Sequence, residues 1–162
     1  MEPISKYFNE EKYESVFFVL VGIISIILSI FFFLKVKTPF YNGVSYALLA
    51  VATLQLTVGI TVYFRSPKDI IRVENLVKFD KSRIQTNEIP RMEVVMKNFV
   101  LYRYIQILLI VVGLIFFFYF NTETLMKGLG IGLFIQSVLM LFLDYFAEKR
   151  GFDYIDFLKN LS

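Results

Sequence analysis

Long runs of apolar residues dominate the chain. Four of them stand out, each close to the roughly 20 residues that a helix needs to cross about 30 Å of hydrocarbon. They cover residues 16–34, 44–64, 99–120 and 125–146, about half of the chain. The pattern predicts an all-α membrane protein, a four-transmembrane-helix bundle forming a single membrane domain over residues 1–162.

The links within the first and second pairs of runs are short. Thr38-Pro39 and Asn42-Gly43 fall at the first link, and such residues stop one helix and turn the chain before the next. The other link, residues 121–124, is shorter still. Short links force neighbouring helices to be antiparallel, so we expect two helical hairpins.

The middle connection, residues 65–98, contains a pattern typical of a helix start. Ser66-Pro67-Lys68-Asp69 places an N-cap serine before a proline and an acid in the first turn. The apolar residues that follow predict a short amphipathic helix on the membrane surface, or one packed against the ends of the bundle. Both alternatives bury the same stripe, which consists of Ile70, Val73, Leu76 and Val77.

Two more helices are expected outside or beyond the apolar runs. Pro90 is well placed to open a helix, and we expect it to run unbroken through Phe120. In the C-terminal tail, residues 147–162, apolar residues recur at helical spacing and predict an amphipathic helix at the interface or folded under the long connection. These residues are Phe152, Ile155, Leu158 and Leu161.

The distribution of Lys and Arg predicts the orientation in the membrane. Thirteen of them lie in the two tails and the middle connection, whereas three lie on the opposite side: Lys35 and Lys37 in the first link and Lys127 at the start of the fourth run. The positive side of a membrane protein is usually cytoplasmic, so we expect both termini in the cytoplasm. The excess indicates contact with anionic lipid head groups on that side, and no interleaving of basic and aromatic residues suggests a nucleic-acid partner.

Composition then narrows the possible chemistry. The chain is 57% hydrophobic and contains no Cys and no His. Disulfides, thiol nucleophiles, imidazole metal ligands and Ser-His-Asp triads are therefore excluded. Glu88 and Glu93, with Arg91 between them, are interpreted as surface charges at the start of a helix, not as a catalytic or metal-binding pair. We expect no catalytic residues, no metal site and no cofactor.

Ionisable residues at membrane depth are expensive and are therefore candidates for a functional site. Arg103 lies four residues into the third run and Asp144 two residues before the end of the fourth, so in antiparallel helices they reach nearly the same depth and are expected to pair. The alternatives are a structural clasp and a cytoplasm-facing cavity that binds a charged ligand or relays protons. Three further charges are expected in this layer: Arg65, Glu14 and Glu148.

Gln55 and Gln136 lie near the centres of their runs, where an unpaired amide is costly. Either they bond to each other within one chain, or Gln55 faces outward and bonds to another subunit. The outward alternative follows if a stripe of small and hydroxylated residues on the second run faces the bundle, because Gln55 lies roughly opposite it. That stripe is Gly43, Ala47, Ala50, Thr53, Thr57 and Thr61.

Similar faces are expected to make helix contacts on the other runs. They are Gly22, Ser25 and Ser29 on the first, Phe99, Arg103, Gln106, Ile110, Gly113 and Phe117 on the third, and Gly128 to Gly132 on the fourth.

Parts of the second half resemble stretches of small uncharacterised bacterial four-span inner-membrane proteins. The similar segments are Glu88-Ile-Pro-Arg-Met-Glu93, Asn98-Phe-Val-Leu-Tyr-Arg103, and Gln136 with residues 141–150. The resemblance implies a bacterial inner-membrane location. It carries over no functional residue, because the family has no assigned activity.

These observations favour a non-enzymatic membrane interaction protein, either self-associating or serving as an accessory, regulatory or immunity-type subunit. The alternative is a small oligomeric transporter or channel with its charged site at Arg103 and Asp144.

Overall fold

The computed structural model describes residues 2–161, so the predicted domain's end residues, Met1 and Ser162, lie outside the described part. Its α-helices are α1 (Glu2–Phe31), α2 (Pro39–Phe79), α3 (Ile89–Tyr119) and α4 (Leu125–Leu161), and two π-helical turns, η1 (Phe32–Val36) and η2 (Ile84–Glu88), adjoin them. Four helices are long and apolar enough to cross a membrane. The prediction of an all-α bundle with four candidate spans is confirmed.

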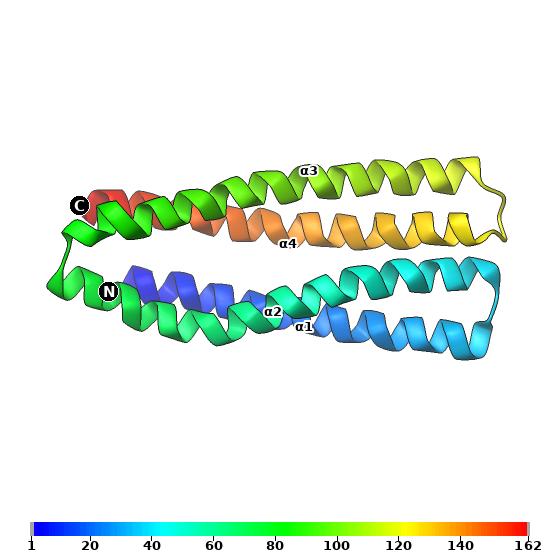
Figure 1. Ribbon diagram of the computed structural model, residues 1–162, viewed down its shortest axis with the longest axis horizontal. Helices are drawn as coiled ribbons and strands as arrows, with labels where there is room; N and C mark the ends of the chain where they lie inside the picture. Colours follow the sequence, from blue (N-terminus) through cyan, green and yellow to red (C-terminus); the bar gives the residue numbers. More distant parts are fainter. Residues whose placement is uncertain (1, 162) are drawn as a thin grey trace.

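The helices form two antiparallel hairpins, α1 with α2 and α3 with α4 (Figure 1). Both chain termini and the connection from α2 to α3 lie at one end of the molecule, here called the terminal end, and the two short links lie at the distal end. The hairpins pack together mainly through α2 and α4. As a result α2 and α4 are inner helices, while α1 and α3 are outer ones.

The first distal link turns as predicted. Thr38 is the N-cap of α2, its hydroxyl accepts the backbone N–H of Tyr41 at 3.5 Å, and Pro39 takes the first helical position. Lys37, which closes η1, has a φ of 56° and donates its backbone N–H to the carbonyl of Phe32 at 3.0 Å. This left-handed residue reverses the chain within two residues of the next helix.

The middle connection departs from prediction at Ser66 and Pro67. No new helix starts there, because α2 continues through Pro67 to Phe79. The hydroxyl of Ser66 donates to the carbonyl of Val62 at 2.8 Å instead of capping a helix. The buried face of α2 continues past Pro67 through Ser66, Asp69 and Val73. This packing stabilises the helix enough to offset the backbone hydrogen bond that Pro67 cannot donate.

The apolar stripe that follows packs within the molecule. Val73 is fully buried, and Ile70, Leu76 and Val77 pack against the same core. Of the two alternatives for this segment, the described contacts therefore favour packing against the ends of the bundle. The segment is helical, but it is the continuation of α2 and not a separate surface helix.

The C-terminal tail likewise continues an existing helix. α4 runs unbroken through Gly151 to Leu161, with Ile155 and Leu158 buried and Phe152 exposed. Gly151 sits where a Cβ would lie 2.7 Å from the sulfur of Met96. The glycine thus marks a close contact between α4 and α3.

A hydrophobic core at the terminal end joins the two hairpins. All four helices and η2 contribute to it, so both hairpins are fixed to one another there. The stacked rings of Tyr7 and Tyr154, with centroids 4.2 Å apart, link α1 to α4. The buried members are Ile4, Tyr7, Phe8, Val73, Ile84, Met92, Met96, Tyr154, Ile155 and Leu158.

Close backbone approach joins the hairpins at the distal end. A Cβ on Gly43 would lie 2.0 Å from the carbonyl oxygen of Leu125, and one on Gly128 would lie 1.8 Å from that of Phe40. Only glycine permits this contact between α2 and α4. The predicted small-residue contacts of Gly43 and of Gly128 to Gly132 are confirmed.

The predicted α2 stripe is buried at Gly43 and Ala47, whereas its remaining residues face away from the bundle. Thr53, Thr57 and Thr61 are exposed, and each hydroxyl donates to the carbonyl four residues earlier at 2.7–2.8 Å. The buried face of α2 is centred on Gln55, roughly 120–160° around the helix from the threonines. Each threonine satisfies its hydroxyl within its own helix, so it can face hydrocarbon.

Candidate functional site

The charged residues near the terminal ends of α3 and α4 are brought together, but not in the predicted pairs. Arg103 pairs with Glu148, and the carboxylate of Asp144 accepts a hydrogen bond from the amide of Gln106. Arg103 therefore does not pair with Asp144, as predicted, but with a residue one helical turn farther along α4. The long Arg103 side chain extends toward the terminal end, as basic side chains near the end of a span do, and meets Glu148 there.

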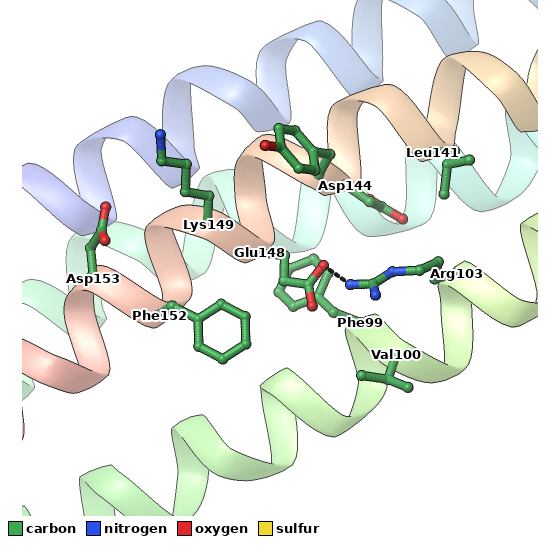
Figure 2. Close-up of a pocket in the computed structure, with 10 residues that line it drawn as sticks. Phe99, Val100, Arg103, Leu141, Asp144, Glu148, Lys149, Phe152 and Asp153 are labelled. Atoms are coloured by element: carbon green, nitrogen blue, oxygen red, sulfur yellow. Dashed lines mark hydrogen bonds and ion pairs between the residues drawn. The ribbon is translucent and has the colours of Figure 1, made fainter.

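A groove of about 850 Å³ opens beside these residues, between α3 and α4 (Figure 2). Arg103 from α3 and Asp144 and Glu148 from α4 face one another, and Lys149 points away from them. The Arg103 side chain is 44% exposed, whereas that of Glu148 is 11% exposed. The lining residues are Phe99, Val100, Arg103, Leu141, Asp144, Tyr145, Glu148, Lys149, Phe152 and Asp153.

The other predicted members of the charged layer form separate pairs. Glu14 of α1 pairs with Arg150 of α4, a residue that sequence analysis did not single out. Arg65 of α2 pairs with Glu11 of α1 at 2.8 Å and with Asp69 of its own helix at 3.1 Å. Ion pairs therefore link α1 to α2, α1 to α4 and α3 to α4 near the terminal end.

The most deeply buried charge is Glu88, which sequence analysis interpreted as surface decoration. That interpretation is wrong: Glu88 is fully buried. Its carboxylate accepts two hydrogen bonds from Arg91, at 2.6 and 3.0 Å, and one from Arg72 at 2.8 Å. The hydroxyl of Tyr154 adds a fourth at 3.3 Å. Helices α2, α3 and α4 thus all donate to one carboxylate of η2, while Glu93 is exposed as expected.

The charges around Glu88 form a continuous network outside the four apolar runs. Asp69 lies 3.1 Å from Arg72 and joins the Glu88 group to Arg65 and Glu11. Ser66 donates to the second carboxylate oxygen of Glu11 at 3.2 Å. The network therefore extends from α1 through α2 to η2, α3 and α4.

The pKa values of two network carboxylates move in opposite directions. Burial alone would raise the pKa of Glu88, but the hydrogen bonds and charges of Arg91 and Arg72 hold it below its ordinary value of 4.5. Burial raises the pKa of Glu11, and the charge of Arg65 and the hydrogen bond from Ser66 offset this only in part. The surroundings of Glu88 thus favour its charged form over its neutral form, whereas those of Glu11 disfavour the charged form.

Sequence reasoning missed this network because its signals are weak along the chain. Glu88 and Arg91 are close in sequence, but their spacing was interpreted only as charge at the start of a helix. Arg72 and Tyr154 are 16 and 66 residues away from Glu88, so only the packed fold brings them together.

The central glutamines bond within the chain. Gln55 donates to the side-chain oxygen of Gln136 at 3.1 Å, and Gln136 donates to the hydroxyl of Ser25 at 2.6 Å. Gln55 is fully buried, so the alternative in which it faces outward is wrong. The predicted contact face of α3 is confirmed at Gln106 and Gly113, both buried.

Most of these charged groups link one helix to another. In the part of the chain that the structure describes, no group of three or more Asp or Glu residues is placed to hold a metal ion. The principal charges are engaged in ion pairs or hydrogen bonds that link helices, and Asp144, beside the groove, is bonded only to a neutral amide.

Comparison with known proteins finds no family model, no curated protein and no solved structure that matches the chain. The functional argument below therefore rests on geometry and charge.

Proposed function

We propose that this chain is a non-enzymatic integral membrane protein that acts by associating with a partner helix inside the bilayer, through the exposed face of α3. The single observation that carries the proposal is the packing of α3. Within the most apolar part of α3 only 11% of the residues are buried, against 33% for α2. In a closed bundle each helix has two neighbours, and α3 packs mainly against α4.

The exposed face of α3 has the spacing that helix pairing uses. Its apolar residues alternate at intervals of three and four, opposite the buried Gln106 and Gly113. Leu108, near the middle, is 61% exposed. A second helix can lie along this stripe, which consists of Leu101, Tyr104, Leu108, Val111, Ile115 and Phe118.

The interior of the chain favours association over conduction by one copy. Backbone contacts at Gly43 and Gly128 close the distal end between α2 and α4. The bonds from Gln55 to Gln136 and from Gln136 to Ser25 occupy the centre. A path for solute would have to break both sets of contacts.

The proposed setting is the bacterial inner membrane, with the terminal end in the cytoplasm and its excess of Lys and Arg near anionic lipid head groups. The partner is a second copy of this chain or a different membrane protein. In the second case the chain is an accessory, regulatory or immunity-type subunit.

Co-purification of the tagged full chain from its native membrane tests the proposal. We expect a stoichiometric second copy or second polypeptide to be retained by the wild type and lost from Leu108→Ala/Ile115→Ala. The matched control is Leu54→Ala/Val58→Ala on the exposed face of α2, which should retain it. Retention of a partner by all three proteins, or by none, would contradict a role for α3.

A second candidate function, transport by an oligomer, is favoured by one observation. The groove beside Arg103 and Asp144 holds ionisable residues at the ends of two spans, and ionisable residues within spans can mark a pathway for a solute or ion. Flux through purified protein in liposomes, abolished by Asp144→Asn, would establish this alternative. A wild-type protein that is stably folded in liposomes but shows no flux would support association.

A further inference from the structure

The groove between α3 and α4 lies where the apolar runs of both helices end. Phe99 and Leu141 belong to those runs, and Phe152 lies beyond them (Figure 2). This is the depth at which phospholipid head groups meet the hydrocarbon. We propose that the groove binds a zwitterionic phospholipid whose head group carries a primary ammonium, the chemistry of phosphatidylethanolamine.

Of the two carboxylates that face Arg103 across the groove, Asp144 and Glu148, one has no counter-charge. Arg103 and Glu148 neutralise each other. Asp144 accepts a hydrogen bond from the neutral amide of Gln106, and no ion pair within residues 2–161 involves it. A half-buried carboxylate of this kind gains most from a bound cation with N–H donors, which a primary ammonium supplies.

Arg103 supplies the complementary contact. One terminal nitrogen of its guanidinium bonds to Glu148, and a guanidinium has five N–H donors in all. The side chain is 44% exposed, so further donors are open to the groove. Arginine binds phosphate through paired N–H groups, so Arg103 fits the phosphate of the same lipid whose ammonium meets Asp144.

The remaining walls suit the glycerol and the first part of the acyl chains. Phe99, Val100, Leu141 and Phe152 give the groove an apolar lining on both sides of the charged group. Its volume of about 850 Å³ lies within the range of small-molecule sites. An amphiphile therefore fits better than a free phosphate or a free amine.

The same charges discriminate among lipids. An anionic head group could place its phosphate against Arg103, but it brings no cation to Asp144 and so leaves that carboxylate without a counter-charge. A trimethylated ammonium has the right charge, but it has no N–H to donate to a carboxylate and is bulkier. The expected order of binding is phosphatidylethanolamine, then phosphatidylcholine, then phosphatidylglycerol.

Native mass spectrometry of the purified full chain in detergent tests this order. With equimolar phosphatidylethanolamine, phosphatidylcholine and phosphatidylglycerol, we expect one lipid per chain, with the ethanolamine lipid retained at least five times as often as either other lipid. Equal retention of the three, or a preference for phosphatidylglycerol, would overturn the proposal.

A variant then assigns the site. Asp144→Asn keeps an oxygen that accepts the bond from Gln106 but removes the charge, so retention of the ethanolamine lipid should fall to that of phosphatidylcholine. Asp156→Asn is the matched control, the same change at an exposed position of α4 outside the groove, and should bind as the wild type does. Selectivity unchanged in folded Asp144→Asn would overturn the site. If that variant does not fold, the lipid comparison on the wild type still decides.

Discussion

Gln55 on α2 donates its side-chain N–H to the side-chain oxygen of Gln136 on α4 at 3.1 Å, midway along the apolar runs of both helices. Gln136 also donates to Ser25 on α1, so one side chain joins three helices. The bond explains why two amides are tolerated at a depth where an unpaired amide is costly.

Gln136→Leu should therefore destabilise the protein more than a single lost bond, because it strands both Gln55 and Ser25. We expect a loss of about 1 to 2 kcal/mol in the free energy of unfolding, measured by denaturant titration in detergent. Gln55→Leu/Gln136→Leu should be less destabilised than the sum of its single changes, since no glutamine is left unpaired. Strict additivity of the two changes would argue against the bond.

The Arg103 pairing gives a second double-mutant cycle. Arg103→Leu with Glu148→Leu should show a coupling of about 0.5 to 1 kcal/mol, a modest value because Arg103 is partly exposed. The matched cycle of Arg103→Leu with Asp144→Leu should show a smaller coupling, since their side chains bond to other partners. The reverse order, seen in thermal melts in detergent, would restore the pairing predicted from sequence.

Among the charged residues described, Glu88 is the one whose neutralisation is expected to lower the free energy of unfolding most. Glu88→Gln leaves Arg72 and Arg91 without their shared carboxylate, and we expect a loss of about 3 kcal/mol at neutral pH. Because folding lowers the pKa of Glu88, its contribution is fully present above pH 4.5 and is lost as the pH falls through the lowered pKa. The stability difference between the wild type and Glu88→Gln should therefore shrink in acid. The control is Glu93→Gln at an exposed position, which should change stability by less than about 0.5 kcal/mol at every pH.

The opposite pH dependence is expected at Glu11. Folding raises its pKa, so its contribution is present below pH 4.5 and is lost as the pH rises through the raised value. Unfolding titrations of the wild type and Glu11→Gln should show that the variant gains stability relative to the wild type as the pH rises above 4.5. A difference that does not vary with pH would mean that folding leaves the pKa of Glu11 unchanged.

The distal glycine contact predicts a graded response to alanine. Gly43→Ala places a Cβ 2.0 Å from a backbone oxygen, so α2 and α4 must separate, and we expect a loss of more than about 2 kcal/mol. Gly22→Ala is the matched control, because its Cβ would meet the flexible side chain of Leu56 at 3.0 Å. Equal stability of the two variants, measured in the same detergent, would contradict the close packing of α2 against α4.

The helices themselves could be predicted from sequence because apolar runs of membrane length have few other solutions. The unbroken helix that begins near Pro90, the turn at Thr38-Pro39 and the contact face around Gln106 all follow from local rules. The new helix expected to start at Ser66 does not occur, because tertiary packing continues α2 through Pro67, a residue that usually interrupts a helix.

The partners of the charged residues could be predicted less well. Depth along antiparallel helices placed Arg103, Glu148 and Asp144 in one layer, but side-chain length decided which carboxylate Arg103 reaches. The outward alternative for Gln55 depended on one stripe of small residues, but the buried side of α2 is a different face, on which Leu48, Val51, Ala52 and Gly59 lie beside Gln55. The burial of Glu88 depends on contacts from three helices and has no local signal.

Site-specific photocrosslinking in the native membrane tests the proposed association through α3 most directly. A photoreactive residue at position 108 of α3 is compared with one at position 54 of α2, since both lie near the centre of their apolar runs and are similarly exposed, at 61% and 63%. The account predicts one discrete protein adduct from position 108 and none from position 54. Lipid adducts alone at position 108, or the same protein adducts from both positions, would contradict it.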